Sequence, residues 1–224
     1  HLQQTHRLPT LDAESAGVSH ELVQQPPLYY AMAALADWGQ GMSAARQVDH
    51  RNPYTAKGLS KRYTITLPNS EPGLALPLYI ARFVTFLGGL LTVWFTWLLT
   101  RALLPTEPWA AIAVASVVGF NPQFLFSSAT ITNDTWASAL FVGAVYLVQR
   151  ACRMDKAGWW LLAGLSIGAA ALTKYSDLLV VIPTGVLFLW QLYLERKAIR
   201  WPLWLRALLL LAIGFLASGG FWYL

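Results

Sequence analysis

The sequence predicts an all-α integral membrane protein with about six transmembrane helices. Hydrophobic residues make up 56% of the chain and charged residues only 12%, and eleven tryptophans are present. Apolar runs near the 20 residues that cross a hydrocarbon core follow one another from residue 75 onward. Such a composition is typical of a chain whose main solvent is lipid.

Charge divides the chain into two regions. Residues 1–74 carry six acidic and six basic side chains, whereas residues 75–224 carry five acidic and ten basic ones. The first region has too few apolar clusters to bury a core of its own, so we expect an extracytoplasmic loop region that lies on the membrane. Residues 75–224 are the expected transmembrane helical domain. Their excess of positive charge marks orientation and does not indicate a nucleic-acid partner.

An interfacial helix is predicted within the first region, at residues 26–37. Pro27 stands at an early helical position, where a missing N–H costs nothing. Tyr29, Tyr30 and Trp38 suit the level of the lipid headgroups. The segment that follows is rich in turn-forming residues, so no further regular element is predicted there.

Six apolar segments of the second region are candidate membrane crossings. The third and fourth are short, which is tolerable for helices buried inside a bundle. In the fourth, Gly164, Gly168 and the alanines at 169–171 form a small-residue face that suits close helix packing. The six segments are 76–104, 109–126, 135–150, 158–172, 178–194 and 203–224.

Basic residues between these segments predict the orientation. They follow the first segment, the third segment and the fifth segment, and these three loops fall on one side of the membrane. The positive-inside rule makes that side cytoplasmic. The opposite side then receives residues 1–74 together with the loops at Asn133-Asp134 and Lys174–Asp177. The basic residues concerned are Arg101, Arg150, Arg153, Lys156, Arg196, Lys197, Arg200 and Arg206.

Two basic residues on the extracytoplasmic side are candidate substrate-binding residues. Lys174 follows Thr173 at the outer end of a helix, where its ammonium group could bind a phosphate and stabilise a leaving group. The alternative is a lysine that snorkels to the membrane surface. Arg82 lies near the outer start of the first helix, and its guanidinium group matches phosphate oxygens. An ordinary interfacial anchor would also explain Arg82.

Asn133 and Asp134 are the other candidate substrate-binding residues. They end a polar cluster that also contains Thr130 and Thr132, and hydrophobicity resumes directly after them. Such a cluster could hydrogen-bond sugar hydroxyls. The alternative is helix capping, because Thr132 or Asn133 can cap a helix that starts near residue 135. The Asp134 carboxylate in the first turn would then interact favourably with the helix dipole.

Three motifs carry a resemblance to a known family. They are QPPLYY at 25–30, NPQFLFSSATITND at 121–134 and LTKYS at 172–176. In this order they resemble the membrane glycosyltransferases of the GT-C superfamily, and the nearest relatives are protein O-mannosyltransferases and lipid A aminoarabinose transferases. The resemblance implies inverting transfer of a sugar from a polyprenyl phosphate donor to an acceptor at the extracytoplasmic face. It also implies a multi-pass protein of the bacterial cytoplasmic (inner) membrane, with membrane lipids and other membrane subunits as further partners.

The resemblance also implies a catalytic base in the first outer loop, within a pattern like D-E-x-x-H. If His1 is the histidine of that pattern, the acidic residue lies upstream of the given sequence, and we expect residues 1–224 alone to lack transferase activity. The hydrophobic run at Leu224 likewise suggests a fragment that lacks the family's later helices. Within the chain, Glu21 is the candidate catalytic carboxylate because it lies just before the PPLYY helix. The alternative is a solvated loop carboxylate.

Several other classes of protein lack support in the sequence. Cys152 is the single cysteine, so an intrachain disulfide and a thiolate metal cluster are excluded. Histidines with metal-ligand spacing and phosphate-binding glycine loops are absent. We therefore expect no cofactor, with a divalent metal left as an alternative. The alternative function is a noncatalytic multispanning subunit of a larger membrane complex, and a transporter is a weaker third reading.

Overall fold

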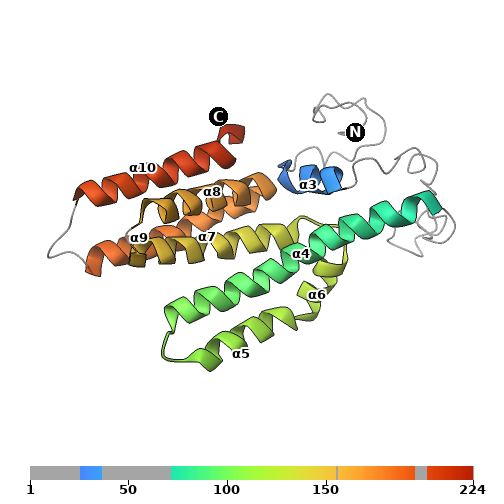
Figure 1. Cartoon of the computed structure of the whole chain (residues 1–224), viewed down its shortest axis with the longest axis horizontal. Helices are drawn as coiled ribbons and strands as arrows, with labels where there is room; N and C mark the ends of the chain where they lie inside the picture. The colour runs from blue at the N-terminus through green and yellow to red at the C-terminus, as the bar shows by residue number, and fades with distance from the viewer. Residues whose placement is uncertain (1–25, 37–71, 155, 195–200, 224) are drawn as a thin grey trace, which may run out of the picture.

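The computed structural model describes residues 26–36, 72–154, 156–194 and 201–223, and these residues form helices and short connections without a strand. The helices lie roughly along one long axis (Figure 1). The predicted all-α class is therefore confirmed. Glu21 and all four histidines lie outside the described residues.

The short helix α3, Leu28–Ala36, coincides with the predicted interfacial helix at 26–37. It contacts α4 and α8 at one end of the bundle (Figure 1). Tyr29 is the anchor of α3, because its side chain is 1% exposed and its hydroxyl lies 2.8 Å from the Thr85 hydroxyl of α4. A position at the level of the lipid headgroups stays a prediction.

The first predicted crossing is the long helix α4, Pro72–Leu103. The second differs from the prediction, because residues 109–126 form two helices that are bent by 61°. These are α5, Pro108–Gly119, and α6, Pro122–Ala129. The cause is Asn121-Pro122: proline disfavours helical geometry in the residue before it. The Asn121 side chain then caps the new helix by accepting from the N–H groups of Gln123 and Phe124, at 2.9 and 3.1 Å.

The remaining predicted segments coincide with helices. They are α7, Asp134–Met154; α8, Ala157–Thr173; the 3-10 helix η1, Tyr175–Val180, which leads into α9, Val181–Leu194; and α10, Trp201–Ser218, followed by η2, Gly220–Tyr223. By length and apolar composition three described helices can span a membrane, at Leu76–Leu103, Tyr175–Leu194 and Trp201–Ser218, and the bent pair makes up to four. The finding supports an integral membrane protein. That α7 and α8 also cross, which makes six crossings, stays a prediction.

Helix α8 lies inside the bundle and packs closely on α10. A Cβ atom on Gly164 would collide with the backbone of Leu211, and one on Gly214 would lie 2.5 Å from the Leu161 carbonyl oxygen. Gly168 likewise faces Phe215, whose carbonyl oxygen would lie 2.5 Å from an added Cβ. The predicted small-residue face of the fourth segment is therefore confirmed, and it explains how a helix of 17 residues is accommodated.

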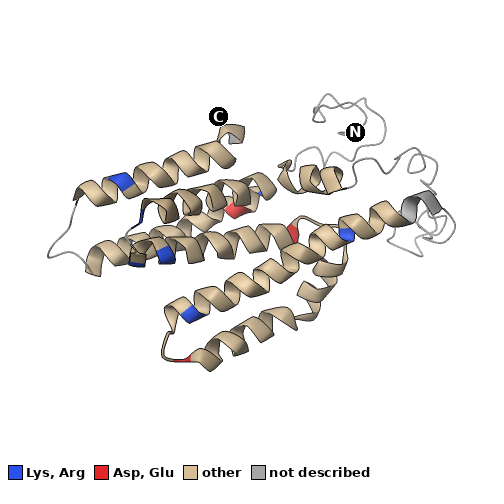
Figure 2. Cartoon of the chain, in the orientation of Figure 1, with Lys and Arg blue, Asp and Glu red and all other residues tan. Residues whose placement is uncertain are grey.

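Positive charge is concentrated at one end of the bundle. Most lysines and arginines of the described chain lie toward the end away from α3 (Figure 2). Nearby, an aromatic cluster joins three helices through edge contacts, with ring centroids of Trp160, Phe188 and Trp204 4.8 to 6.0 Å apart. This arrangement supplies the geometric premise of the predicted orientation, while the identity of the cytoplasmic side stays a prediction.

Candidate functional site

The loop before α7 and the end of α8 meet at an ion pair. Lys174 Nζ donates to Asp134 Oδ1 at 2.7 Å, although the two residues are 40 positions apart. Asp134 is the first residue of α7, and Lys174 follows the last residue of α8 in extended conformation. The side chains keep 40% (Lys174) and 46% (Asp134) of their surface exposed, so a ligand can still reach both groups.

Asn133 ties the same two loops together from below the surface. Asn133 is 5% exposed, and its Nδ2 donates to the Thr173 carbonyl oxygen at 3.0 Å. The Thr132 hydroxyl accepts from the Asp134 backbone N–H at 3.3 Å, as expected from the capping alternative. Asn133 thus holds Lys174 beside Asp134, and its direct contact with a substrate stays a prediction.

A chain of hydroxyl groups fixes the start of α7 against α4. The Thr135 hydroxyl donates to the Thr85 carbonyl oxygen at 2.8 Å, and the Thr92 hydroxyl donates to the Thr135 carbonyl oxygen at 3.1 Å. Trp136 adds a hydrogen bond from its indole nitrogen to the Val84 carbonyl oxygen at 2.7 Å. Because Tyr29 also bonds Thr85, α3, α4 and α7 are held in one network. Sequence reasoning did not predict the roles of Thr85, Thr92, Thr135 and Trp136. The available signal was the hydroxyl groups inside apolar helices, which often form hydrogen bonds across helices.

Electrostatics link Asp134 to α3 as well as to Lys174. Burial raises the pKa of the Asp134 carboxyl, but the hydrogen bond and charge of Lys174 and the Thr132 hydroxyl outweigh it, so that the pKa lies below its usual value. Burial, together with the proximity of Tyr29 and of the Asp134 charge, raises the pKa of the Tyr30 phenol. Tyr30 is therefore neutral beside an ionised Asp134.

Asp177 adds a second carboxylate near Lys174. The residue is 8% exposed, and Ser176 Oγ donates to its Oδ1 at 3.5 Å. Its other oxygen, Oδ2, is buried without a hydrogen bond from the described residues. With both carboxylates ionised, Asp134, Lys174 and Asp177 sum to one negative charge. Sequence reasoning placed Asp177 in a polar loop but did not treat it as a site residue.

Arg82 is not joined to this cluster. It is exposed on α4, and none of the described residues forms an ion pair with it. Its role in substrate binding stays a prediction, as does that of Glu21. The described residues also contain no group of three or more His, Cys, Asp or Glu that could hold a metal ion.

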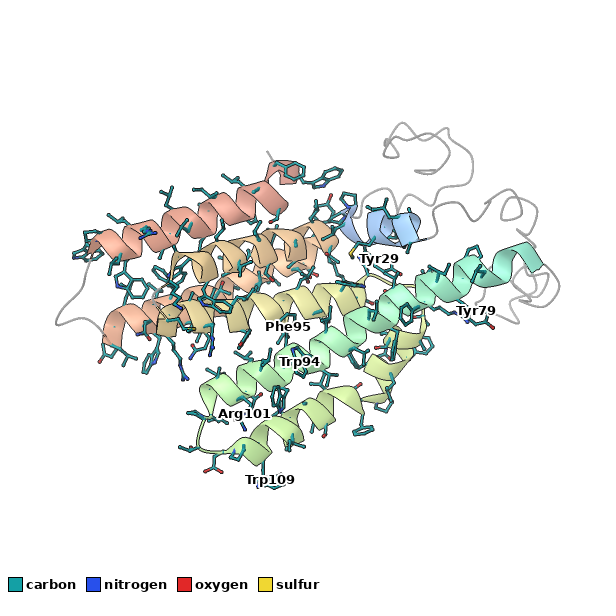
Figure 3. All side chains as sticks on the ribbon, in the orientation of Figure 1. Tyr29, Tyr79, Trp94, Phe95, Arg101 and Trp109 are labelled. Atoms are coloured by element: carbon teal, nitrogen blue, oxygen red, sulfur yellow. The ribbon has the colours of Figure 1, made fainter. Side chains whose placement is uncertain are left out.

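Two cavities adjoin the start of α7. A cavity of about 450 Å³ lies between α5, α6 and α7 and includes Asp134 in its lining. A groove of about 1010 Å³, lined almost entirely by apolar side chains, lies between α4 and α5 and reaches Trp136. Trp94 extends into this groove from α4, whereas Trp109 points away from the bundle (Figure 3). The apolar groove and the smaller cavity, whose lining adds several polar groups to apolar ones, thus lie on two sides of α5.

Comparison with known proteins identifies one family. The model of the family described as dolichyl-phosphate-mannose-protein mannosyltransferase matches residues 78–219. The match covers more than half of the chain, including Asp134 and Lys174. No curated protein and no solved structure gives a significant match.

Proposed function

The chain belongs to the dolichyl-phosphate-mannose-protein mannosyltransferase family, and from this premise we propose that it transfers a sugar from a polyprenyl phosphate donor to an acceptor at the extracytoplasmic membrane face. The resemblance to the GT-C superfamily is confirmed by the family match. The donor, the acceptor and the membrane face belong to the proposal.

The apolar groove between α4 and α5 supports a lipid-linked donor. Its wall consists of side chains such as Leu87, Leu90 and Trp97 from α4 and Ile112 from α5. A groove of this kind offers dispersion contacts to a hydrocarbon chain along its length. A polyprenyl chain therefore matches the groove in both chemistry and shape.

Lys174 is the proposed phosphate ligand. Its side chain is 40% exposed and lies at the end of the bundle that bears α3. Because Asp134 already accepts one of its hydrogen bonds, a phosphate can share the ammonium group through its remaining donors. Asp134, Lys174 and Asp177 together carry one negative charge, which disfavours an anion. When the phosphate binds, Lys174 therefore turns toward it or one carboxylate becomes protonated.

The transfer step needs a base and a leaving group. The acceptor oxygen attacks the anomeric carbon, the bond from that carbon to the phosphate oxygen breaks, and the acceptor proton passes to a carboxylate. Glu21 remains the proposed base within this chain. Lys174 stabilises the polyprenyl phosphate that leaves, because charge develops on the bridging oxygen at that moment.

Lys174→Met tests the donor site, since it keeps the apolar stem and removes the charge. In the protein purified into lipid nanodiscs, we expect binding of a polyprenyl phosphate sugar to weaken by about 1.5 to 3 kcal/mol, the range for a hydrogen bond to a charged group. Lys156→Met, at the opposite end of the bundle, is the matched control and should bind as the wild type does. Unchanged donor affinity in a folded Lys174→Met variant would show that Lys174 is only an interfacial anchor.

A further inference from the structure

The cavity between α5, α6 and α7 has a lining that the proposed phosphate site does not use. Its volume of about 450 Å³ falls in the range of small-molecule sites. Valines and a phenylalanine form one part of the wall, and amide, hydroxyl and carboxylate groups form the other. The lining residues are Val117, Val118, Asn121, Gln123, Phe124, Ser127, Asp134, Thr135 and Ser138.

Several polar groups of this lining are available to a ligand. Within the described part of the chain, the side chains of Gln123, Ser127 and Ser138 form no hydrogen bond. Asn121 uses its carbonyl oxygen to cap α6, which leaves its Nδ2 as a donor. An apolar pocket with a few convergent polar groups is the usual form of a small-molecule site.

The charge of the lining selects the class of ligand. Asp134 is its one ionisable residue among those described, and its lowered pKa keeps the carboxylate ionised. Lys174 pairs with this carboxylate from outside the lining, and the lining itself offers an anion no cation. A hydroxyl group, in contrast, can donate to the carboxylate and also accept from the amide of Gln123 or the hydroxyl of Ser138.

The bend between α5 and α6 places these groups around one space. Because α6 leaves the line of α5 at Asn121-Pro122, Gln123 and Ser127 lie in the same lining as Ser138 of α7. Phe124 contributes an aromatic surface beside them. Polar hydroxyl-binding groups beside an aromatic ring suit a pyranose, which has hydroxyls at its edge and C–H groups on its faces.

We propose that this cavity binds the ring of a neutral hexose through Gln123, Ser138 and the Asp134 carboxylate. The inference rests on the proposed function in taking the ligand to be a sugar, and it separates the sugar subsite from the phosphate at Lys174. Asp134 lies between the two, since one of its oxygens accepts from Lys174 and its side chain lines the cavity.

The test is binding of methyl α-mannoside to the protein in nanodiscs, measured by saturation-transfer NMR and titration. Gln123→Met and Ser138→Ala each remove one polar group with little change of volume. Each should weaken methyl α-mannoside binding about 2- to 10-fold, the range for a neutral hydrogen bond. Gln149→Met on α7, away from this cavity, is the matched control and should leave binding unchanged.

The outcomes separate this inference from the transferase proposal. If no sugar is transferred but methyl α-mannoside binds and both variants weaken it, the cavity is a sugar site in a protein with another activity. If sugar is transferred while both variants keep wild-type binding and KM, the cavity inference is wrong. Absence of methyl α-mannoside binding to the wild type, or its competitive displacement by inorganic phosphate, would also overturn it.

Discussion

Asp134 and Lys174 determine the charge at the end of the bundle where α3, α7 and α8 meet. Each residue was predicted as a substrate-binding candidate, but their pairing was not, because 40 residues separate them in the chain. The pairing changes the interpretation of both: Lys174 is not a lone cation, and Asp134 is more than a helix cap. Asn133 was also predicted as a substrate-binding candidate. It is buried and donates a hydrogen bond to the Thr173 carbonyl oxygen, a contact between two loops that local capping rules do not indicate.

The ion pair predicts a loss of stability at acidic pH. Asp134 has a lowered pKa in the folded protein, so its contribution is present above the unfolded value near 3.8 and is lost as the pH falls through the folded pKa. Because both side chains are about half exposed, we expect a contribution of only about 0.2 to 1 kcal/mol. Denaturant unfolding in detergent micelles from pH 6 to pH 3 should show this loss in the wild type.

Asp134→Asn is the comparison for that experiment. It removes the titrating carboxylate and should flatten this part of the pH dependence, while Glu107→Gln at the other end of the bundle should not. An identical acid profile in the wild type and Asp134→Asn would show that the pair contributes nothing measurable.

Removing the Asp177 carboxylate is expected to strengthen anion binding, in contrast to the loss of binding expected for Lys174→Met. Asp177→Asn removes one carboxylate charge near Lys174 and raises the sum of the cluster from one negative charge to zero. At pH 8 we expect polyprenyl phosphate to bind about 2- to 5-fold more tightly, because two unit charges a few ångströms apart interact by about 1 kcal/mol where water screens them. Weaker or unchanged phosphate binding would place the phosphate away from Lys174, and Glu107→Gln again serves as the control.

At the scale of the elements, the apolar periodicity of the sequence located the helices but not the contacts between them. The break at Asn121-Pro122 was missed because an apolar run of sufficient length was interpreted as one crossing, although Asn-Pro is a recognised turn signal. The Thr85 and Thr135 bonds were missed because a threonine in an apolar helix shows no partner in the sequence. Gly164 and Gly168 were predicted well, since small residues four apart mark a close-packed face independently of the partner.

Glycine substitutions distinguish the face of α8 that packs on α10 from the unpacked position of Gly185 on α9. Gly164→Ala should destabilise the fold by about 1 to 3 kcal/mol, because the added Cβ meets the Leu211 backbone and overpacking forces α8 and α10 apart. Gly185→Ala on α9 is the matched control, since an added Cβ there has no neighbour within 4 Å. It should be neutral or stabilising by up to about 1 kcal/mol through helix propensity. Thermal unfolding in nanodiscs measures both, and equal effects would refute the close-packing account.

At the scale of the whole molecule, the separation of charges along the bundle is the basis of the predicted membrane orientation. Most of the basic residues lie at one end (Figure 2). The ion pair of Asp134 and Lys174 lies at the start of α7 and the end of α8, and α8 contacts α3. The sequence predicted this separation because each loop contributes its own basic residues, and helices that alternate in direction bring alternate loops together. The sequence could not predict the two cavities beside α7, since they depend on how α5 and α6 bend.

The same separation predicts the topology, which single-cysteine labelling can test. In a Cys152→Ser background, Ser176→Cys lies on an exposed position beside Lys174, and Met154→Cys lies at the basic end. A membrane-impermeant maleimide applied to intact cells should modify the cysteine at 176 and spare the one at 154, because cytoplasmic loops carry the excess of Lys and Arg. Both should react after the membrane is permeabilised. Modification of 154 with protection of 176 would place the ion pair and the cavity beside Asp134 on the cytoplasmic side, where a sugar transferase of the proposed orientation could not act.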